Sequence, residues 1–260
     1  MELYKITYTV SGKRADIVLN RPDKRNAFNA MLVEELRYAF TQADQDPMVK
    51  VVVLRAAGQV FSAGADLEYL QSLQENTYEK NLADSEFLMG LYKQIYTMSK
   101  PVIAQIEGHA IAGGCGLATV CDFSFAVPEA QFGYTEVKIG FIPAIVMVFL
   151  LRKVNERNAR ELLLTGKLIS AEAAHHMGLI NGVIEQPFIG AKVDALCNDL
   201  IEQTSRLSLQ STKHMIAAIQ EMSLDEALAY AAQKNAEARA PRDCKYGIAS
   251  FLEKKKPEWD

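Results

Sequence analysis

The chain has 260 residues, of which 49% are apolar and 23% charged, and this composition is typical of one large globular domain or a domain with an appendage. A formal net charge of −4 gives no general attraction to nucleic acid or to an anionic membrane. The longest apolar run, residues 144–151, is too short to span a bilayer, and the N-terminus lacks a signal-peptide pattern. Four cysteines without a CxxC pair or a zinc-like spacing predict reduced thiols in a cytoplasmic protein that holds no metal.

Strands and helices alternate through the first part of the sequence. Residues 4–20 alternate between apolar and polar as the two strands of a β-hairpin do, and a polar loop follows. A helical pattern then runs from 27 to 43, and the uninterrupted apolar residues of 50–56 predict a buried strand. Residues 67–98 form a long helical stretch with polar interruptions.

The alternation continues and then gives way to helices. Buried strands are predicted at 100–108 and 121–128, and residues 130–143 are predicted as an irregular loop that contains a single carboxylate. The amphipathic segments that follow are helical, and nearly unbroken toward the C-terminus. We therefore predict an α/β core over residues 1–187 and a helical region over residues 188–260.

Two short loops share one design. "SAGADL", residues 62–67, and "IAGGCG", residues 111–116, each follow a predicted strand, consist mostly of small residues and open a helix. A helix N-terminus presents free backbone N–H groups, and small residues let a ligand approach them closely. One N–H from each loop could therefore donate a hydrogen bond to the same oxygen, so that the two form an oxyanion hole. The alternatives are that the small residues only relieve crowding, or that the loops hold a dinucleotide, although "AGGCG" does not fit GxGxxG.

Six longer stretches occur in this order along the chain: "NRPDKRNAFN", "FSAGADL", "KPVIAQIEGHAIAGGCGLATVCD", "AQFGYTEVKIGFIP", "LTGKLISAEAAHHMGLINGVI" and "FLEKKKPEW". Together they resemble the enoyl-CoA hydratase/isomerase family, the crotonases. The resemblance implies a spiral of ββα units as the core and a C-terminal helical region that mediates trimerisation, giving a homo-trimer or a hexamer. It also implies an acyl-CoA thioester as the substrate, so that coenzyme A is part of the substrate and no separate cofactor is needed.

The resemblance assigns roles to particular residues. It implies that the N–H groups of Ala65 and Gly113 form the oxyanion hole for the thioester carbonyl. It also implies contacts with the CoA part of the substrate, from Lys254 of a neighbouring subunit and, within the same chain, from Arg25, Ala63, Asp66 and Leu67. Arg25 and Lys254 are otherwise ordinary solvated charges in polar runs, and Asp66 is well placed to cap the helix that follows it.

One acidic position of the family pattern is empty here. The hydratases of the family resemble one another in using two glutamates, one after the second small-residue loop and one in the later loop. The first position is Gly116 in this sequence, and the second is Glu136 in "FGYTEV". We expect the glycine to remove a carboxylate and to free volume beside the cleft, so that Gly116→Glu would introduce some hydratase activity. Burial is expected to raise the pKa of Glu136.

A single carboxylate favours double-bond migration over hydration. Glu136 would take a proton from an enoyl thioester and return it two carbons away, as the monofunctional enoyl-CoA isomerases of the family do. The alternatives are a hydratase, perhaps for a branched or carboxylated substrate, with a substitute second acid, and a non-catalytic CoA- or RNA-binding homologue. Glu86, Tyr92 and His109 are candidates for that acid, although each is expected to be structural.

Residues 144–151, "AIVMVFLL", stand where many relatives have glycines. These bulky side chains either shorten and dry the acyl pocket, which would disfavour the addition of water, or simply form a core helix.

Overall fold

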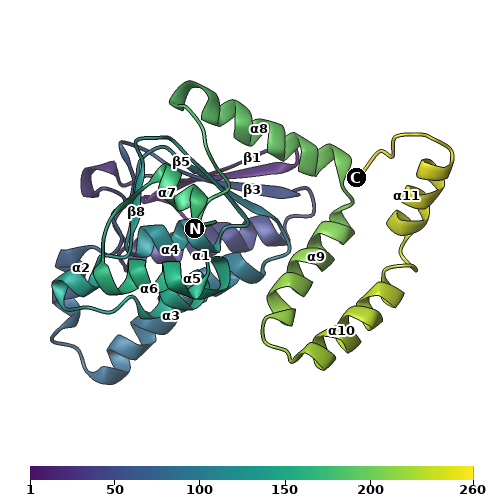
Figure 1. The fold of residues 1–260 in the computed structure, drawn as a ribbon. Coiled ribbons are helices and arrows are strands. Elements are labelled where there is room, and N and C mark those ends of the chain that lie inside the picture. The colour runs from purple at the N-terminus through teal and green to yellow at the C-terminus, as the bar shows by residue number, and fades with distance from the viewer. Residues whose placement is uncertain (260) are drawn as a thin grey trace.

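Two sheets, most of whose strands are parallel, form the centre of the computed structural model, which describes residues 1–259 (Figure 1). Among these residues only the β1–β2 and β8–β9 pairs are antiparallel. The first sheet has the order β1 (Ile6–Ser11), β2 (Arg14–Leu19), β3 (Val51–Ala56), β5 (Val102–Ile106), β7 (Phe123–Ala126), β10 (Gly182–Val183). The second sheet has the order β4 (Val60–Ser62), β6 (His109–Ile111), β8 (Gln131–Gly133), β9 (Ile169–Ser170).

Successive strand pairs build a spiral. In each of the pairs β3–β4, β5–β6 and β7–β8, the first strand joins one sheet and the second strand joins the other. The chain then returns through helical segments and begins the next turn. This is the spiral of ββα units that the sequence predicts. The short strands β6 and β8 were expected as loops, because three residues in a row show too little alternation to identify a strand.

The helices between the strands follow the predicted pattern with one division. The helical stretch predicted at 67–98 breaks into α2 and α3, because the Thr77 hydroxyl accepts from the Lys80 N–H and starts a new helix. The α-helices of this part are α1 (Ala30–Gln45), α2 (Leu67–Leu73), α3 (Tyr78–Thr97), α4 (Gly113–Val120), α5 (Ala144–Lys153), α6 (Glu156–Thr165) and α7 (Ala171–His176). Two 3₁₀ turns, η1 (Pro22–Lys24) and η2 (Glu136–Ile139), lie in the loops.

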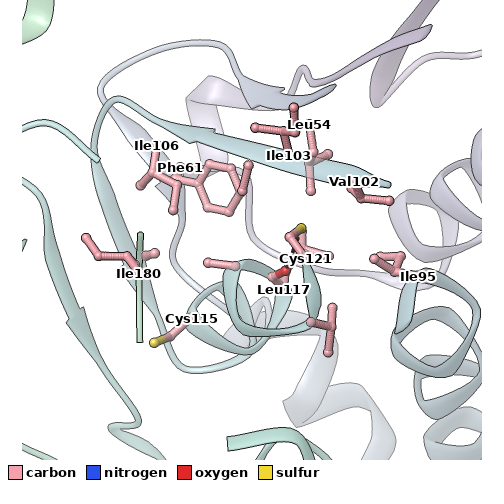
Figure 2. Close-up of a cluster of buried hydrophobic side chains, with 14 of the residues drawn as sticks. Leu54, Phe61, Ile95, Val102, Ile103, Ile106, Cys115, Leu117, Cys121 and Ile180 are labelled. Atoms are coloured by element: carbon pink, nitrogen blue, oxygen red, sulfur yellow. Dashed lines mark hydrogen bonds between the residues drawn. The ribbon is translucent and has the colours of Figure 1, made fainter. Parts of the chain in front are cut away.

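The largest buried cluster joins the first sheet to α4 (Figure 2). Leu54 and Ile103 of the sheet and Leu117 of α4 are fully buried within it. Cys115 and Cys121 flank Leu117, and burial raises the pKa of each thiol to about 12, so both stay protonated at neutral pH. All four cysteines are free, as expected.

The C-terminal region is helical, as predicted, but its first helix belongs to the core. Helix α8 (Gln186–Gln203) packs on the first sheet through Ile189, Val193 and Cys197. The part that extends away from the body begins after it and comprises α9 (Arg206–Ile219), α10 (Leu224–Glu237) and α11 (Arg242–Leu252) (Figure 1). None of the helices within residues 1–259 has both the length and the hydropathy of a membrane span.

Candidate active site

A cavity of about 460 Å³ opens where three loops meet at the ends of the second sheet's strands. Its lining includes six of the residues singled out in the sequence: Arg25, Ala63, Ala65, Asp66, Leu67 and Glu136. Gly113 directly follows Ala112, which also lines the cavity. Lys254 is not among the lining residues of this chain, and its role in a neighbouring subunit stays a prediction.

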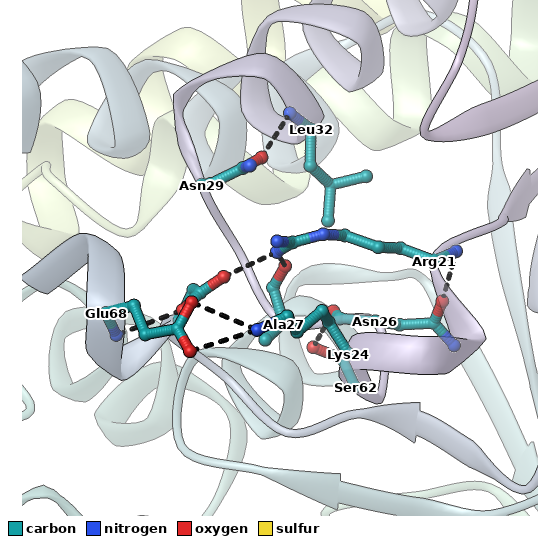
Figure 3. Close-up of polar contacts among 9 residues, drawn as sticks. Arg21, Lys24, Asn26, Ala27, Asn29, Leu32, Ser62 and Glu68 are labelled. Carbon is teal, nitrogen blue, oxygen red and sulfur yellow. Dashed lines mark hydrogen bonds and ion pairs between the residues drawn. The ribbon is translucent and has the colours of Figure 1, made fainter.

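A buried polar network holds one side of the cavity in place (Figure 3). The Asn26 side chain is fully buried and accepts from the Arg21 N–H at 2.8 Å. It donates to the carbonyls of Ala57 and Val60, where the chain turns from β3 into β4. Arg21 in turn pairs with Asp66 at 2.8 Å and donates to the Ala27 carbonyl at 2.9 Å. Asp66 also accepts from the Glu68 N–H, which makes it the N-cap of α2 as expected. Its carboxylate is therefore engaged within the protein.

The first small-residue loop presents one unused N–H group. Phe28 donates to the Gly64 carbonyl at 2.7 Å and accepts from the Asp66 N–H at 2.9 Å. These two bonds bracket Ala65, whose own N–H has no acceptor among residues 1–259. A buried or half-buried N–H without a partner is costly, so it marks a place where a ligand oxygen can bind.

The second small-residue loop enters α4 through a strained residue. Ala112 has φ 49° and ψ −123°, a conformation that costs a residue with a side chain about 1–3 kcal/mol. Its N–H donates to the Gly133 carbonyl at 2.7 Å, which ties the loop to β8. Gly113 is then the first residue of α4, so no earlier carbonyl of the helix accepts from its N–H.

The two loops touch each other at Gly64. A Cβ atom on Gly64 would lie 2.7 Å from the Ala112 Cβ and 3.0 Å from the Gly113 nitrogen. Gly64 also has φ +82°, which an L side chain rarely adopts. The glycine is therefore required for the close approach that brings the Ala65 and Gly113 segments together. This juxtaposition supports the predicted oxyanion hole.

Glu136 supplies a buried carboxylate to the same cavity. It is the first residue of η2, and its Oε2 atom is buried without a hydrogen-bond partner among the described residues. Burial raises the pKa of Glu136, in the direction expected from the sequence. The other acidic residues of the lining are exposed or paired: Asp23 is exposed, Glu68 pairs with Lys24 and Asp66 with Arg21. Glu136 is therefore the carboxylate best suited to exchange a proton with a bound substrate.

The expectation that Gly116 frees volume beside the cleft is wrong. A Cβ atom at this position would lie 2.2 Å from Val146 Cγ1 and 3.4 Å from Tyr92 Cε1. The space is filled by α5, which packs against α4, and both Val146 and Tyr92 are buried. The bulky residues at 144–151 therefore occupy the position over Gly116, and a glutamate introduced there alone has no room.

Tyr92 is the one substitute-acid candidate that approaches the site. Its hydroxyl donates to the Gly113 carbonyl at 2.8 Å, and the ring is fully buried. Burial and the neighbouring charge of Glu136 hold the pKa of Tyr92 well above its usual value, so it serves as a fixed donor and not as an acid. Glu86 and His109 are exposed, do not line the cavity, and His109 accepts from the Gln131 N–H.

Sequence reasoning missed three residues that shape this site. Asn26 and Phe28 hold the first loop, and Val146 fills the space over Gly116. Asn26 and Phe28 stand in "RNAFN", which was noticed only as part of a longer stretch. The bulk of residues 144–151 was noticed, but the sequence does not reveal which side of that helix meets α4.

Comparisons with known proteins agree with this architecture. Residues 11–260 match the model of the family described as enoyl-CoA hydratase/isomerase. A Thermus thermophilus protein provisionally named an enoyl-CoA hydratase is 40% identical to this chain, over 95% of this chain and 98% of its own length. The crotonyl-CoA hydratase of Syntrophomonas wolfei is 31% identical over 94% of this chain and 93% of its own length. The crystal structure of an enoyl-CoA hydratase from Mycobacterium smegmatis has a TM-score of 0.94 and 28% identity, covering 98% of this chain and 99% of that one.

Proposed function

Because the chain belongs to the enoyl-CoA hydratase/isomerase family, we propose that it moves a double bond in an enoyl-CoA thioester with Glu136 as the only acid and base. The observation that carries this proposal is the packing over Gly116, where Val146 takes the space that a second carboxylate would need. Hydration uses two such groups, one for the water and one for the carbon, whereas migration of a double bond needs one.

The proposed reaction has two proton transfers. The thioester carbonyl accepts hydrogen bonds from the Ala65 and Gly113 N–H groups, which stabilise the negative charge of a dienolate. Glu136 in its ionised form removes a proton from the carbon next to the carbonyl, and the resulting carboxylic acid returns it two carbons further along. The raised pKa of Glu136 supports the first step, because it makes the carboxylate a stronger base.

Hydration of a 2-enoyl-CoA is the second candidate, and the names of the relatives favour it. It would require Glu136 to handle the water and the carbon in turn, because Glu86 and His109 lie outside the cavity and Tyr92 already donates to Gly113. A non-catalytic CoA-binding homologue would have no use for a buried, unpaired carboxylate, which costs stability.

The two candidates are separated by one incubation. The protein is mixed with a 3-enoyl-CoA and, separately, with a 2-enoyl-CoA, and the thioester products are resolved by chromatography. We expect interconversion of the 2- and 3-enoyl isomers, with little 3-hydroxyacyl-CoA. Rapid formation of 3-hydroxyacyl-CoA without isomerisation would reject the isomerase proposal in favour of the hydratase.

We further propose that the chain assembles through its projecting helices into a homo-trimer or hexamer. Large apolar side chains of α10 and α11 support this, because Leu224, Phe251 and Leu252 are 75%, 83% and 76% exposed. Closed symmetric assembly is the usual way to cover such a surface, and it would bring Lys254 to a neighbouring subunit. Light scattering at micromolar concentration tests the proposal, and a stable monomer would contradict it.

A further inference from the structure

A second, larger cavity lies where α3 and α5 face the C-terminal helices α9 and α10. It has a volume of about 680 Å³ and is lined by α3 and α5 together with residues of α9 and α10. Met89 and Tyr96 of α3 and Ile145 and Phe149 of α5 give it a largely apolar wall. No lining residue is common to the two cavities. Residues of α3 and α5 line the second cavity but not the catalytic one.

Three side chains connect the first turns of α4 to the second cavity. Tyr92 is fully buried and Val146 is 5% exposed, and both lie over Gly116. The Tyr92 ring lies 6.2 Å from the ring of Phe149, measured between centroids, and Phe149 lines the second cavity. The succession from Gly116 through Tyr92 and Val146 to Phe149 is thus a packed apolar layer, which we call the acyl partition.

The acyl partition stands close to the proposed carbonyl site. A Cβ atom on Gly113 would lie 3.2 Å from the Tyr92 hydroxyl oxygen, and that hydroxyl is fixed on the Gly113 carbonyl. An acyl chain that continued from a carbonyl on the Gly113 N–H toward α3 would therefore meet the Tyr92 side of the partition. The hydrogen bond of the Tyr92 hydroxyl and the burial of Tyr92 and Val146 mean that this layer cannot open without loss of packing.

We infer that Tyr92, Val146 and Phe149 restrict the substrate to short acyl groups, and that Val146 is the residue of the acyl partition that sets this limit. The inference rests on the proposed function and goes beyond it by naming the class of acyl group. The second cavity is large enough to take the end of a long acyl chain, but the partition closes the path to it.

The unmodified protein gives the first test. Calorimetric titrations with coenzyme A and with butyryl-, hexanoyl- and octanoyl-CoA measure binding without turnover, because these thioesters are saturated. A pocket that accepted every added methylene would tighten binding about fourfold for each one. We expect no such gain beyond the butyryl group. A steady fourfold gain up to octanoyl-CoA would overturn the inference.

A matched pair of variants gives the second test. Val146→Ala removes bulk from the acyl partition, and Val148→Ala makes the same change on the same helix at a side chain that lines only the second cavity. We expect Val146→Ala to tighten octanoyl-CoA binding about 15-fold relative to butyryl-CoA, which corresponds to roughly two newly buried methylenes. Val148→Ala should leave this ratio unchanged. Equal effects of the two variants, or none from Val146→Ala, would contradict the role of Val146.

Thermal unfolding shows whether each variant folds, and Phe149→Leu replaces Val146→Ala if the latter does not.

Different results would overturn the inference and the proposed function. A protein that binds no thioester more tightly than coenzyme A itself would overturn both. A protein that isomerises enoyl-CoA but binds long and short acyl groups with equal increments per methylene would overturn the inference alone.

Discussion

The wall of the cleft formed by η2 differs sharply from the wall formed by the first turns of α4. At η2 the chain keeps a carboxylate, Glu136, that is buried and unpaired and whose pKa is raised by burial. At α4 the corresponding acidic position is Gly116, which is covered by Val146 and Tyr92. At η2 the unpaired Oε2 atom of Glu136 costs stability, whereas at α4 the space over Gly116 is filled by apolar side chains. The difference shows that the same fold can hold a carboxylate with a buried, unpaired oxygen at one position and tight apolar packing at another nearby.

The largest effect is expected from removing the Glu136 carboxylate, which makes the two sides of the cleft alike. Glu136→Gln keeps the shape of the side chain but cannot exchange the proton, so we expect turnover to fall on the order of 10²–10⁴-fold. Binding of a saturated acyl-CoA should be nearly unchanged, as measured by calorimetry. Turnover close to that of the unmodified protein would show that another group transfers the proton.

The opposite change restores a carboxylate to the packed wall. Gly116→Glu forces its side chain into Val146, and we expect overpacking alone to lower the free energy of unfolding by about 1–3 kcal/mol. Combining it with Val146→Gly should relieve the clash, so denaturant unfolding of the two single variants and the double variant should reveal a favourable coupling. We expect 3-hydroxyacyl-CoA only from the double variant. Additive effects on stability would show that the two positions do not share this space.

The hydrogen bond that joins α3 to the start of α4 can be removed without changing the packing. Tyr92→Phe leaves the ring in place and removes the donor to the Gly113 carbonyl, which should lower the free energy of unfolding by about 1 kcal/mol. If Tyr92 also positions the oxyanion loop, kcat should fall while KM stays the same. A change in stability with unaltered kcat would leave the tyrosine a purely structural role.

The smallest expected effect is on the pH dependence of stability. Because the pKa of Glu136 is raised in the folded state, the native protein binds more protons than the unfolded chain above the ordinary value of 4.5. Its stability should therefore fall as pH rises from 4.5 through the raised pKa, whereas Glu136→Gln should not show this loss. The melting temperatures should converge at lower pH. A larger advantage of the glutamine variant at acidic than at neutral pH would contradict the sign.

Sequence alone predicted the elements with strong local patterns. The hairpin at 4–20, the strand at 50–56 and the C-terminal helices follow directly from periodicity, and the loops around Ala65 and Gly113 from their small residues. The short strands β6 and β8 escaped prediction because their stability comes from pairing with distant strands and not from their own three residues.

The side-chain packing around the site was harder to predict than the position of its loops in the sequence. Gly116 and Val146 are 30 positions apart, and nothing in either local pattern shows that one side chain fills the space over the other. The same holds for Tyr92, whose hydroxyl finds its partner only when α3 packs on α4. Such relations depend on the rotation of packed helices, which hydrophobic periodicity defines only to within a face.

The packing between Gly116 and Val146 also limits the order in which the two positions can be substituted. With a glutamate at 116, a valine at 146 would overlap it, so a lineage that began with the acid must lose that side chain before position 146 can gain bulk. The intermediate, with small residues at both positions, has an unfilled space, which is a smaller penalty than a steric overlap. Each later methyl group added at 146 increases stability and makes the return of the acid more difficult. In a lineage that began with the acid, the bulk at 146 would therefore follow the loss of that acid and would oppose its return.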